Sequence, residues 1–112
     1  MKLIIGISGA SGAIYGIRLL ELFHERSDIE THLVITEMGR ATISMETNYS
    51  IKAVEGLADY VHGIRDMAAS ISSGSFCSDG MIIAPCSVKT LSSVANCSND
   101  NLLTRAADVS LK

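Results

Sequence analysis

The sequence lacks the features of several large protein classes. Nine lysine and arginine residues against twelve aspartate and glutamate residues give a formal net charge of -3, so the chain has no basic excess of the kind that binds nucleic acid. No apolar run approaches the roughly 18 residues of a membrane-spanning helix. The apolar run that follows Lys2 meets Gly6 and then Ser8, so a secretory signal does not form. We therefore expect a cytoplasmic protein whose partners include neither nucleic acid nor a membrane.

Cysteine is also scarce. Cys77, Cys86 and Cys97 are odd in number and unevenly spaced, which fits neither a disulfide framework nor a zinc site. We expect buried, reduced thiols at these positions. Hydrophobic residues, in contrast, make up 47% of the 112 residues. This is enough for one globular domain, residues 1–112, around a single core.

Short apolar runs alternate with helical patterns. Residues 3–7 form a continuous apolar run that ends in a glycine-rich turn, as a central parallel strand does. Helical spacing then continues to about residue 25, and a second strand over residues 31–35 completes a βαβ unit. The later pattern predicts helices over residues 36–47, 51–59, 87–95 and 102–112, a loop over 68–79 and a strand over 81–84. Together these elements predict an α/β fold, a parallel sheet with helices on both faces.

The strongest local motif lies between the first strand and the first helix. Gly6, Gly9 and Gly12 have the spacing G-x-x-G-x-x-G, which is neither the dinucleotide-binding motif nor a P-loop. Glycines let the backbone approach a ligand, and the N-terminus of the following helix favours anions. The motif alone fits a phosphate site and a tight turn with close helix packing equally well. A nucleophile elbow at Ser11 is disfavoured, because Ala13 stands where that pattern needs glycine.

Two further segments carry clustered hydroxyl groups. Ser87, Lys89 and Thr90 follow the strand predicted over residues 81–84, and ligands of open α/β sheets bind at such carboxyl ends. An ordinary capped helix start explains the same residues. The serine-rich segment 70–76 is suited to the close approach of a substrate, although serine-rich loops are common.

Three charged side chains are candidates for chemistry. Glu46 precedes a polar break and is either a general acid or base or a solvated helix end. Arg105 and Lys112 are seven positions apart and share one helix face, so they form either a clamp for one phosphate or a solvated basic stripe. The three histidines are expected to be structural or solvated.

Taken together, these segments resemble one family. Six of them stand in the order and approximate spacing of the N-terminal part of the UbiX/Pad-type flavin prenyltransferases, formerly called aromatic-acid decarboxylases: residues 9–13, 30–34, 46–47, 71–76, 85–91 and 103–109. The resemblance extends from Met1 to Lys112. It implies a flavodoxin-like or Rossmann-like fold, FMN as the acceptor, dimethylallyl phosphate as the prenyl donor, and no metal. It also implies that the flavin, prenylated at N5 and C6, serves a separate UbiD-type decarboxylase.

The resemblance assigns roles to individual residues. Those that match FMN-contacting positions of the family are Gly9, Ala10, Ser11, Thr36, Ser87, Val88, Lys89 and Thr90. Those that match the surroundings of the prenyl donor are Ser73, Gly74 and Ser75, with Arg105 and Lys112 at its phosphate. Ser11 and Glu46 match residues that assist proton movement at the reacting flavin.

Members of this family are longer than the present sequence and form homo-oligomers, commonly dodecamers. The chain stops within its last helical pattern, so we expect a sheet that is incomplete at the C-terminus. An inactive remnant that binds FMN or associates with intact subunits is therefore an alternative function. A second alternative is the small subunit of an aromatic or hydroxyarylic acid decarboxylase system. A third is a decarboxylase that acts on a peptidyl cysteine. The sequences of segments 70–76 and 105–109 disfavour this alternative.

Overall fold

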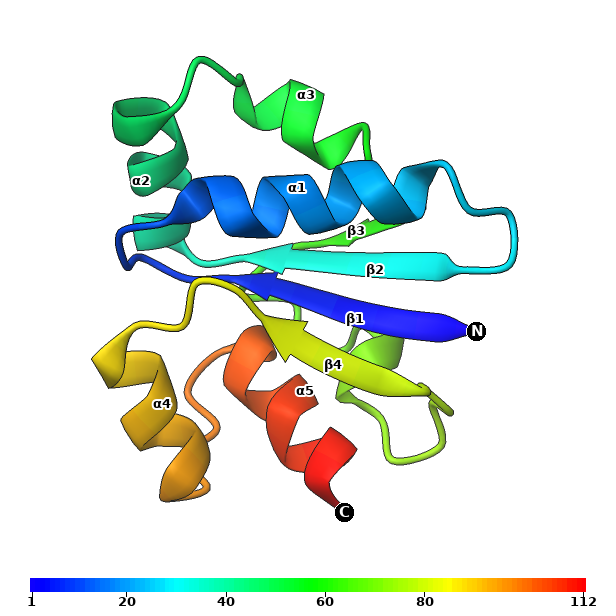
Figure 1. Cartoon of the computed structure of the whole chain (residues 1–112). Coiled ribbons are helices and arrows are strands. Elements are labelled where there is room, and N and C mark those ends of the chain that lie inside the picture. The colour runs from blue at the N-terminus through cyan, green and yellow to red at the C-terminus, as the bar shows by residue number, and fades with distance from the viewer.

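A parallel four-stranded sheet with the order β3-β2-β1-β4 runs through the computed structural model, which describes residues 1–112 (Figure 1). The strands are β1 (Lys2–Ile7), β2 (Glu30–Ile35), β3 (Tyr60–His62) and β4 (Gly80–Ile83). At the centre, Ile5 of β1 lies beside Leu33 of β2 and Ile82 of β4. The predicted flavodoxin-like or Rossmann-like parallel sheet is confirmed.

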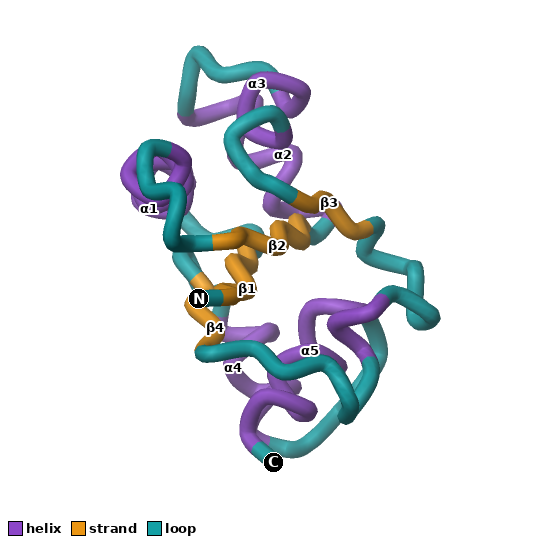
Figure 2. Tube along the Cα trace, turned by 90° about the vertical axis from the view of Figure 1, so that its right-hand side faces the viewer, coloured by secondary structure: helices purple, strands orange, loops and turns teal.

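Helices cover both faces of this sheet (Figures 1 and 2). One face carries α1 (Ala13–His24), α2 (Glu37–Glu46) and α3 (Ile51–Glu55). The other carries α4 (Val88–Ala95), α5 (Leu102–Leu111) and the short 3₁₀ turn η1 (Ser70–Ser72). No helix among them has the length and apolarity required to span a membrane.

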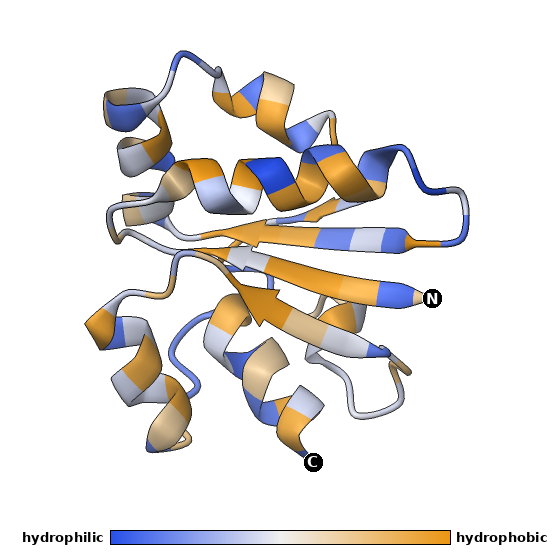
Figure 3. Cartoon of the chain, in the orientation of Figure 1, coloured by the Kyte–Doolittle hydropathy of each residue, from blue (hydrophilic) through white to orange (hydrophobic).

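Figure 3 colours most of β1 and the carboxyl-terminal half of β2 as hydrophobic. Leu33 of β2 packs with Ile17 and Leu20 of α1, and all three are fully buried. The next residue, Val34, points to the opposite face and packs with Leu103 of α5. Because successive side chains of a strand point to opposite faces, a sheet covered on both faces requires a continuous apolar run.

Four helices begin at a residue whose side chain accepts a hydrogen bond from the backbone N–H three positions later. These N-capping residues are Thr36, Ser50, Ser87 and Asn101. Such caps satisfy one of the backbone donors that a helix start leaves unpaired. α1 differs, because Gly12 precedes it with a φ of 105° and gives no side-chain cap.

The structure departs from the predicted elements in three places. β3 is absent from the prediction, because this three-residue edge strand leaves Tyr60 and Val61 exposed and shows no apolar pattern. α3 ends at Glu55, with Gly56 as its C-cap, and not near residue 59. The segment 68–79 contains the 3₁₀ turn η1, whose Ile71 is fully buried.

The prediction of buried cysteines is wrong. Cys77, Cys86 and Cys97 are free, as expected, but exposed. Each lies in a connecting segment: Cys77 precedes β4, Cys86 follows it, and Cys97 has a φ of 56° in the turn after α4. Their exposure follows because connecting segments run over the protein surface.

His32 is structural, as predicted. It is 4% exposed, with its ring stacked on those of Tyr60 and His62 at centroid distances of 4.7 and 5.2 Å. Its Nδ1 lies 3.0 Å from Nε2 of His62 and its Nε2 lies 2.8 Å from Oε2 of Glu30. Both ring nitrogens therefore have partners, which allows a polar ring to be buried. Burial, followed by the neighbouring His32, lowers the pKa of His62.

Candidate functional site

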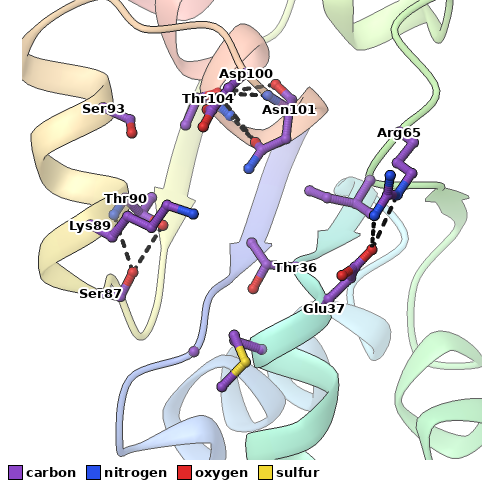
Figure 4. A pocket seen from close by; sticks show the side chains of 13 residues that line it. Thr36, Glu37, Arg65, Ser87, Lys89, Thr90, Ser93, Asp100, Asn101 and Thr104 are labelled. Carbon is purple, nitrogen blue, oxygen red and sulfur yellow. Dashed lines mark hydrogen bonds and ion pairs between the residues drawn. The ribbon is translucent and has the colours of Figure 1, made fainter.

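A cleft of about 460 Å³ opens at the carboxyl ends of β1, β2 and β4. β1 lies between β2 and β4, and the loops that follow these strands lead to helices on opposite faces, so they diverge at this point. Figure 4 shows side chains of α2, α4 and α5 converging on the cleft. Five of the residues predicted to contact FMN line it: Gly9, Thr36, Ser87, Lys89 and Thr90.

Backbone N–H groups without a partner lie at and beside this cleft. They belong to the loop after β1 and to the first turns of α2 and α4. Those that line the cleft are Gly9, Glu37, Met38 and Lys89, and those beside it are Ala10, Ser11 and Val88. Unpaired N–H groups and the positive ends of helix dipoles favour an anion, so this edge of the sheet is suited to a phosphate-bearing ligand.

The start of α1 is occupied by a side chain of the protein itself. Oε1 of Glu46, the last residue of α2, accepts hydrogen bonds from the N–H groups of Gly12 at 3.0 Å and Ala13 at 3.3 Å. The Gly12 N–H, followed by the Ser11 hydroxyl and the Ala13 N–H, lowers the pKa of Glu46. Glu46 is therefore ionised at neutral pH, and its carboxylate caps the start of α1. The structure thus brings the two predicted proton-handling residues, Ser11 and Glu46, together.

Ser8 connects two sides of the cleft, and the sequence analysis missed it. Its fully buried hydroxyl donates to the carbonyl of Pro85 at 2.7 Å and accepts from the N–H of Ser87, also at 2.7 Å. These bonds fix the segment after β4 against the end of β1. The sequence did contain a signal, namely a serine directly after an apolar run predicted to be buried. A hydroxyl group buried there needs hydrogen-bond partners, which suggests a structural role.

The start of α4 presents one unpaired cation to the cleft. Oγ of Ser87 accepts from the N–H of Thr90 at 3.1 Å and donates to Oγ1 of Thr90 at 3.0 Å. Lys89 lines the cleft and forms no ion pair. Val88 also matches a predicted FMN contact, but it is 83% exposed and does not line the cleft.

An ion pair stands at the rim of the cleft (Figure 4). Nη2 and Nε of Arg65 lie 2.6 and 3.1 Å from Oε1 of Glu37, and Arg65 lowers the pKa of that carboxyl group. Both side chains are largely exposed, so the pair adds little stability. The lining residues that the sequence analysis did not single out are Glu37, Met38, Ile64, Arg65, Ser93, Asp100, Asn101 and Thr104. They come from separate elements, and no local motif marks them.

The residues predicted to hold the prenyl donor form a second group outside this cleft. Nζ of Lys112 and Nη1 of Arg105 lie 3.1 and 3.7 Å from Oδ2 of Asp108. Nε of Arg105 also donates to the carbonyl of Ser72 at 3.2 Å, which ties the serine-rich loop to α5. Ser73, Gly74 and Ser75 of that loop are exposed. The structure does not join this group to the cleft.

Comparison with known proteins places this arrangement in a family. The family model described as Flavoprotein matches residues 1–112. The chain belongs to this family. It is 60% identical over 111 residues to the flavin prenyltransferase UbiX of Escherichia coli (strain K12), a match that covers 99% of this chain and 59% of that protein. This flavoprotein therefore spans about three fifths of the length of such a relative.

Solved structures show the same likeness. The crystal structure of AnUbiX (PadA1) in complex with FMN and dimethylallyl pyrophosphate matches with a TM-score of 0.93 and 48% identity, over 96% of this flavoprotein and 57% of that chain. The dodecameric FMN-dependent UbiX-like decarboxylase of Escherichia coli O157:H7 matches with a TM-score of 0.96 and 50% identity, over 97% and 60%. The compared residues therefore share one fold.

Proposed function

We propose that this flavoprotein binds FMN in the cleft and acts as a flavin prenyltransferase, joining a dimethylallyl group from dimethylallyl phosphate to N5 and C6 of reduced FMN. One observation carries the proposal. Five residues that match FMN-contacting positions line a single cleft, in a chain 60% identical to a flavin prenyltransferase. In this proposal, residues 1–112 form the FMN-binding domain.

The residues of the cleft fit FMN. Its phosphate needs donors and positive charge, which the free N–H groups of the loop after β1 and the Lys89 ammonium supply. Its ribityl hydroxyl groups need polar neighbours, and only two of the 13 lining residues are hydrophobic. Ala10 and Ser11 lie in the same loop, and Thr36 at the start of α2 adds a hydroxyl.

In the proposed reaction, bound FMN in its reduced form supplies the nucleophilic ring atoms. Arg105 and Lys112 hold the phosphate of the donor and stabilise the negative charge that develops as it leaves. Ser73, Gly74 and Ser75 border the prenyl group, where their small side chains leave room for it. Glu46, already ionised, accepts a proton through the Ser11 hydroxyl.

Mass spectrometry of the flavin tests this function. The chain is incubated without oxygen with reduced FMN and dimethylallyl phosphate, and the flavin mass should rise by one prenyl group. Dimethylallyl alcohol, which lacks the phosphate leaving group, is the control and should give no change. Bound FMN without a change in mass would contradict transfer by this chain, and absence of FMN binding would contradict the whole proposal.

FMN binding without prenyl transfer is the second candidate function. It is favoured by one observation, namely that Arg105 and Lys112 do not line the cleft that contains the predicted FMN contacts. An FMN titration combined with the mass measurement separates the two candidates. Retained FMN with an unchanged mass supports this second one.

The expected partners follow from the same proposal. A solved relative of 50% identity is dodecameric, which supports a homo-oligomer for this protein. A UbiD-type decarboxylase is the proposed recipient of the prenylated flavin. Three exposed cysteines without a disulfide support a reducing compartment, the cytoplasm.

A further inference from the structure

Asp108 is a buried carboxylate on α5 that the proposed reaction does not use. Its side chain is 7% exposed, and its Oδ2 accepts hydrogen bonds from Nδ2 of Asn99 and Nζ of Lys112, each at 3.1 Å. Nη1 of Arg105 lies 3.7 Å from the same oxygen. The Asn99 bond, followed by the Lys112 bond, lowers the pKa of Asp108, so the group is ionised at neutral pH. Three donors thus converge on one buried oxygen.

The spacing along α5 explains this convergence. Arg105 precedes Asp108 by three positions and Lys112 follows it by four, so all three side chains lie on one helix face. Two cations on one face repel each other, and the carboxylate between them offsets this repulsion. The Asp108 carboxylate therefore holds both cations.

Asp108 leaves part of each cation free for a ligand. The Lys112 side chain is 73% exposed and the Arg105 side chain 37% exposed, whereas the carboxylate beneath them is buried. Arg105 uses Nε for the Ser72 carbonyl, and its remaining N–H groups donate no hydrogen bond within the chain. An ammonium group has three N–H donors, of which Lys112 uses one here. A phosphate can therefore bind from the solvent side without displacing Asp108.

We infer that Asp108 is a positioning residue that holds Arg105 and Lys112 together as one phosphate-binding pair. Through Arg105 and the Ser72 carbonyl it also fixes the serine-rich loop that contains Ser73. The inference rests on the proposed function, in which these two cations bind the phosphate of the prenyl donor. It adds a residue that touches neither substrate but sets the geometry of both cations.

Removing the charge of Asp108 tests whether this carboxylate positions Arg105 and Lys112 or competes with phosphate for them. If the carboxylate only competed with phosphate for the cations, Asp108→Asn would strengthen phosphate binding, because the cluster would gain net positive charge. If Asp108 positions the cations, the same substitution weakens binding by about tenfold, the usual effect of losing one charge-assisted hydrogen bond. The two explanations predict opposite signs.

The experiment is a titration of the full chain with inorganic phosphate, followed by the NMR signal of the Arg105 Nε–H group. Asp108→Asn should weaken binding, and Asp108→Glu, which keeps the charge, should restore most of it. Asp28→Asn is the matched control, because it removes an exposed carboxylate paired with Arg26 at 2.9 Å and should leave binding unchanged. Lys112→Met changes an exposed side chain and should preserve the fold, and in this background Asp108→Asn should have a smaller effect.

The outcomes separate the inference from the proposed function. Equal or tighter phosphate binding by Asp108→Asn would overturn the positioning role, as would a wild-type chain that shows no phosphate response. If Asp108→Asn does not fold, Asp108→Glu and Lys112→Met decide: Asp108→Glu should bind phosphate and Lys112→Met should bind it more weakly. If the phosphate titrations give the expected results but the wild-type chain does not prenylate FMN, only the proposed function is overturned.

Discussion

Ser8 and Ser87 are joined by a hydrogen bond of 2.7 Å, in which the Ser87 N–H donates to the Ser8 hydroxyl. The two residues are far apart in the sequence, yet the bond connects the end of β1 to the start of α4. The Ser8 hydroxyl also donates to the carbonyl of Pro85. The buried Ser8 hydroxyl, together with the backbone bond from the Ser8 N–H to the Pro85 carbonyl at 3.1 Å, therefore holds the two loops that border the cleft.

Ser8→Ala should destabilise the fold by about 1–3 kcal/mol, because it leaves the part-buried Ser87 N–H without its partner and the Pro85 carbonyl with the Ser8 N–H alone. Urea denaturation measures this loss, and FMN affinity should fall with it. Ser27→Ala is the control, since Ser27 is exposed and its hydroxyl has no partner in the chain. A urea midpoint for Ser8→Ala equal to that of the control would show that the two hydrogen bonds of the Ser8 hydroxyl do not contribute to stability.

Gly9→Ala should destabilise the protein, whereas Gly74→Ala should not. A Cβ atom on Gly9 would lie 2.3 Å from Cβ of Met38, so the loop and α2 would have to separate. Such overpacking costs about 1–3 kcal/mol. A Cβ atom on Gly74 meets no atom within 4 Å. Thermal unfolding of the two variants should therefore differ, and equal melting temperatures would refute the close packing of this loop on α2.

Glu46→Gln should lower the melting temperature at neutral pH but not in acid. The folded state lowers the pKa of Glu46 below 4.5 through the Gly12 N–H, the Ser11 hydroxyl and the Ala13 N–H. The carboxylate therefore contributes stability that is present above pH 4.5 and is lost as the pH falls through the lowered pKa. Melting curves from pH 7 to about pH 3 measure the difference in melting temperature between the wild type and Glu46→Gln, which should shrink as the pH falls.

Glu25→Gln is the control for that series, because the exposed Glu25 side chain has no hydrogen bond within the chain. Its melting temperature should follow that of the wild type throughout. A constant gap between Glu46→Gln and the wild type at every pH would mean that the charge of Glu46 is not what stabilises the start of α1.

Lys89→Met should weaken FMN binding by about tenfold, because the substitution removes the unpaired cation of the cleft. Fluorescence titration with FMN measures the affinity, and rising salt should weaken the wild type more than the variant. Lys52→Met is the control, since Lys52 is exposed on α3, away from the cleft. Equal FMN affinities for the two variants would remove Lys89 from the proposed site.

The sequence predicted those elements of the fold that have a local sequence pattern of their own. Residues 3–7 and 31–35 predicted two strands, the first as a continuous apolar run and the second as a run with three apolar residues at its end. The helix predicted from residue 51 does start there, and the hydroxyl of Ser50 directly before it accepts a hydrogen bond from the Ala53 N–H. β3 carried no such signal, since it has three residues at the edge of the sheet.

The candidate site was predictable only in part. The loop after β1 and the start of α4 carry motifs of their own, which identified Gly9 and Ser87. Arg65, in contrast, pairs with Glu37, which the fold brings to it, and no local motif marks it. Asp108 stands at helical spacing from Arg105 and Lys112, but the sequence alone does not show that its carboxylate is buried beneath them. Asn99, in the turn before α5, donates a hydrogen bond to the same carboxylate.

The place of β4 in the sheet has a consequence for assembly. β4 pairs with β1 on one side only, so the backbone amides and carbonyls of its other side are available to a further strand. At the opposite margin, β3 offers only three residues. Any polypeptide that extends this sheet by strand addition will find its longer template at Gly80–Ile83, close to the loop that carries Ser87.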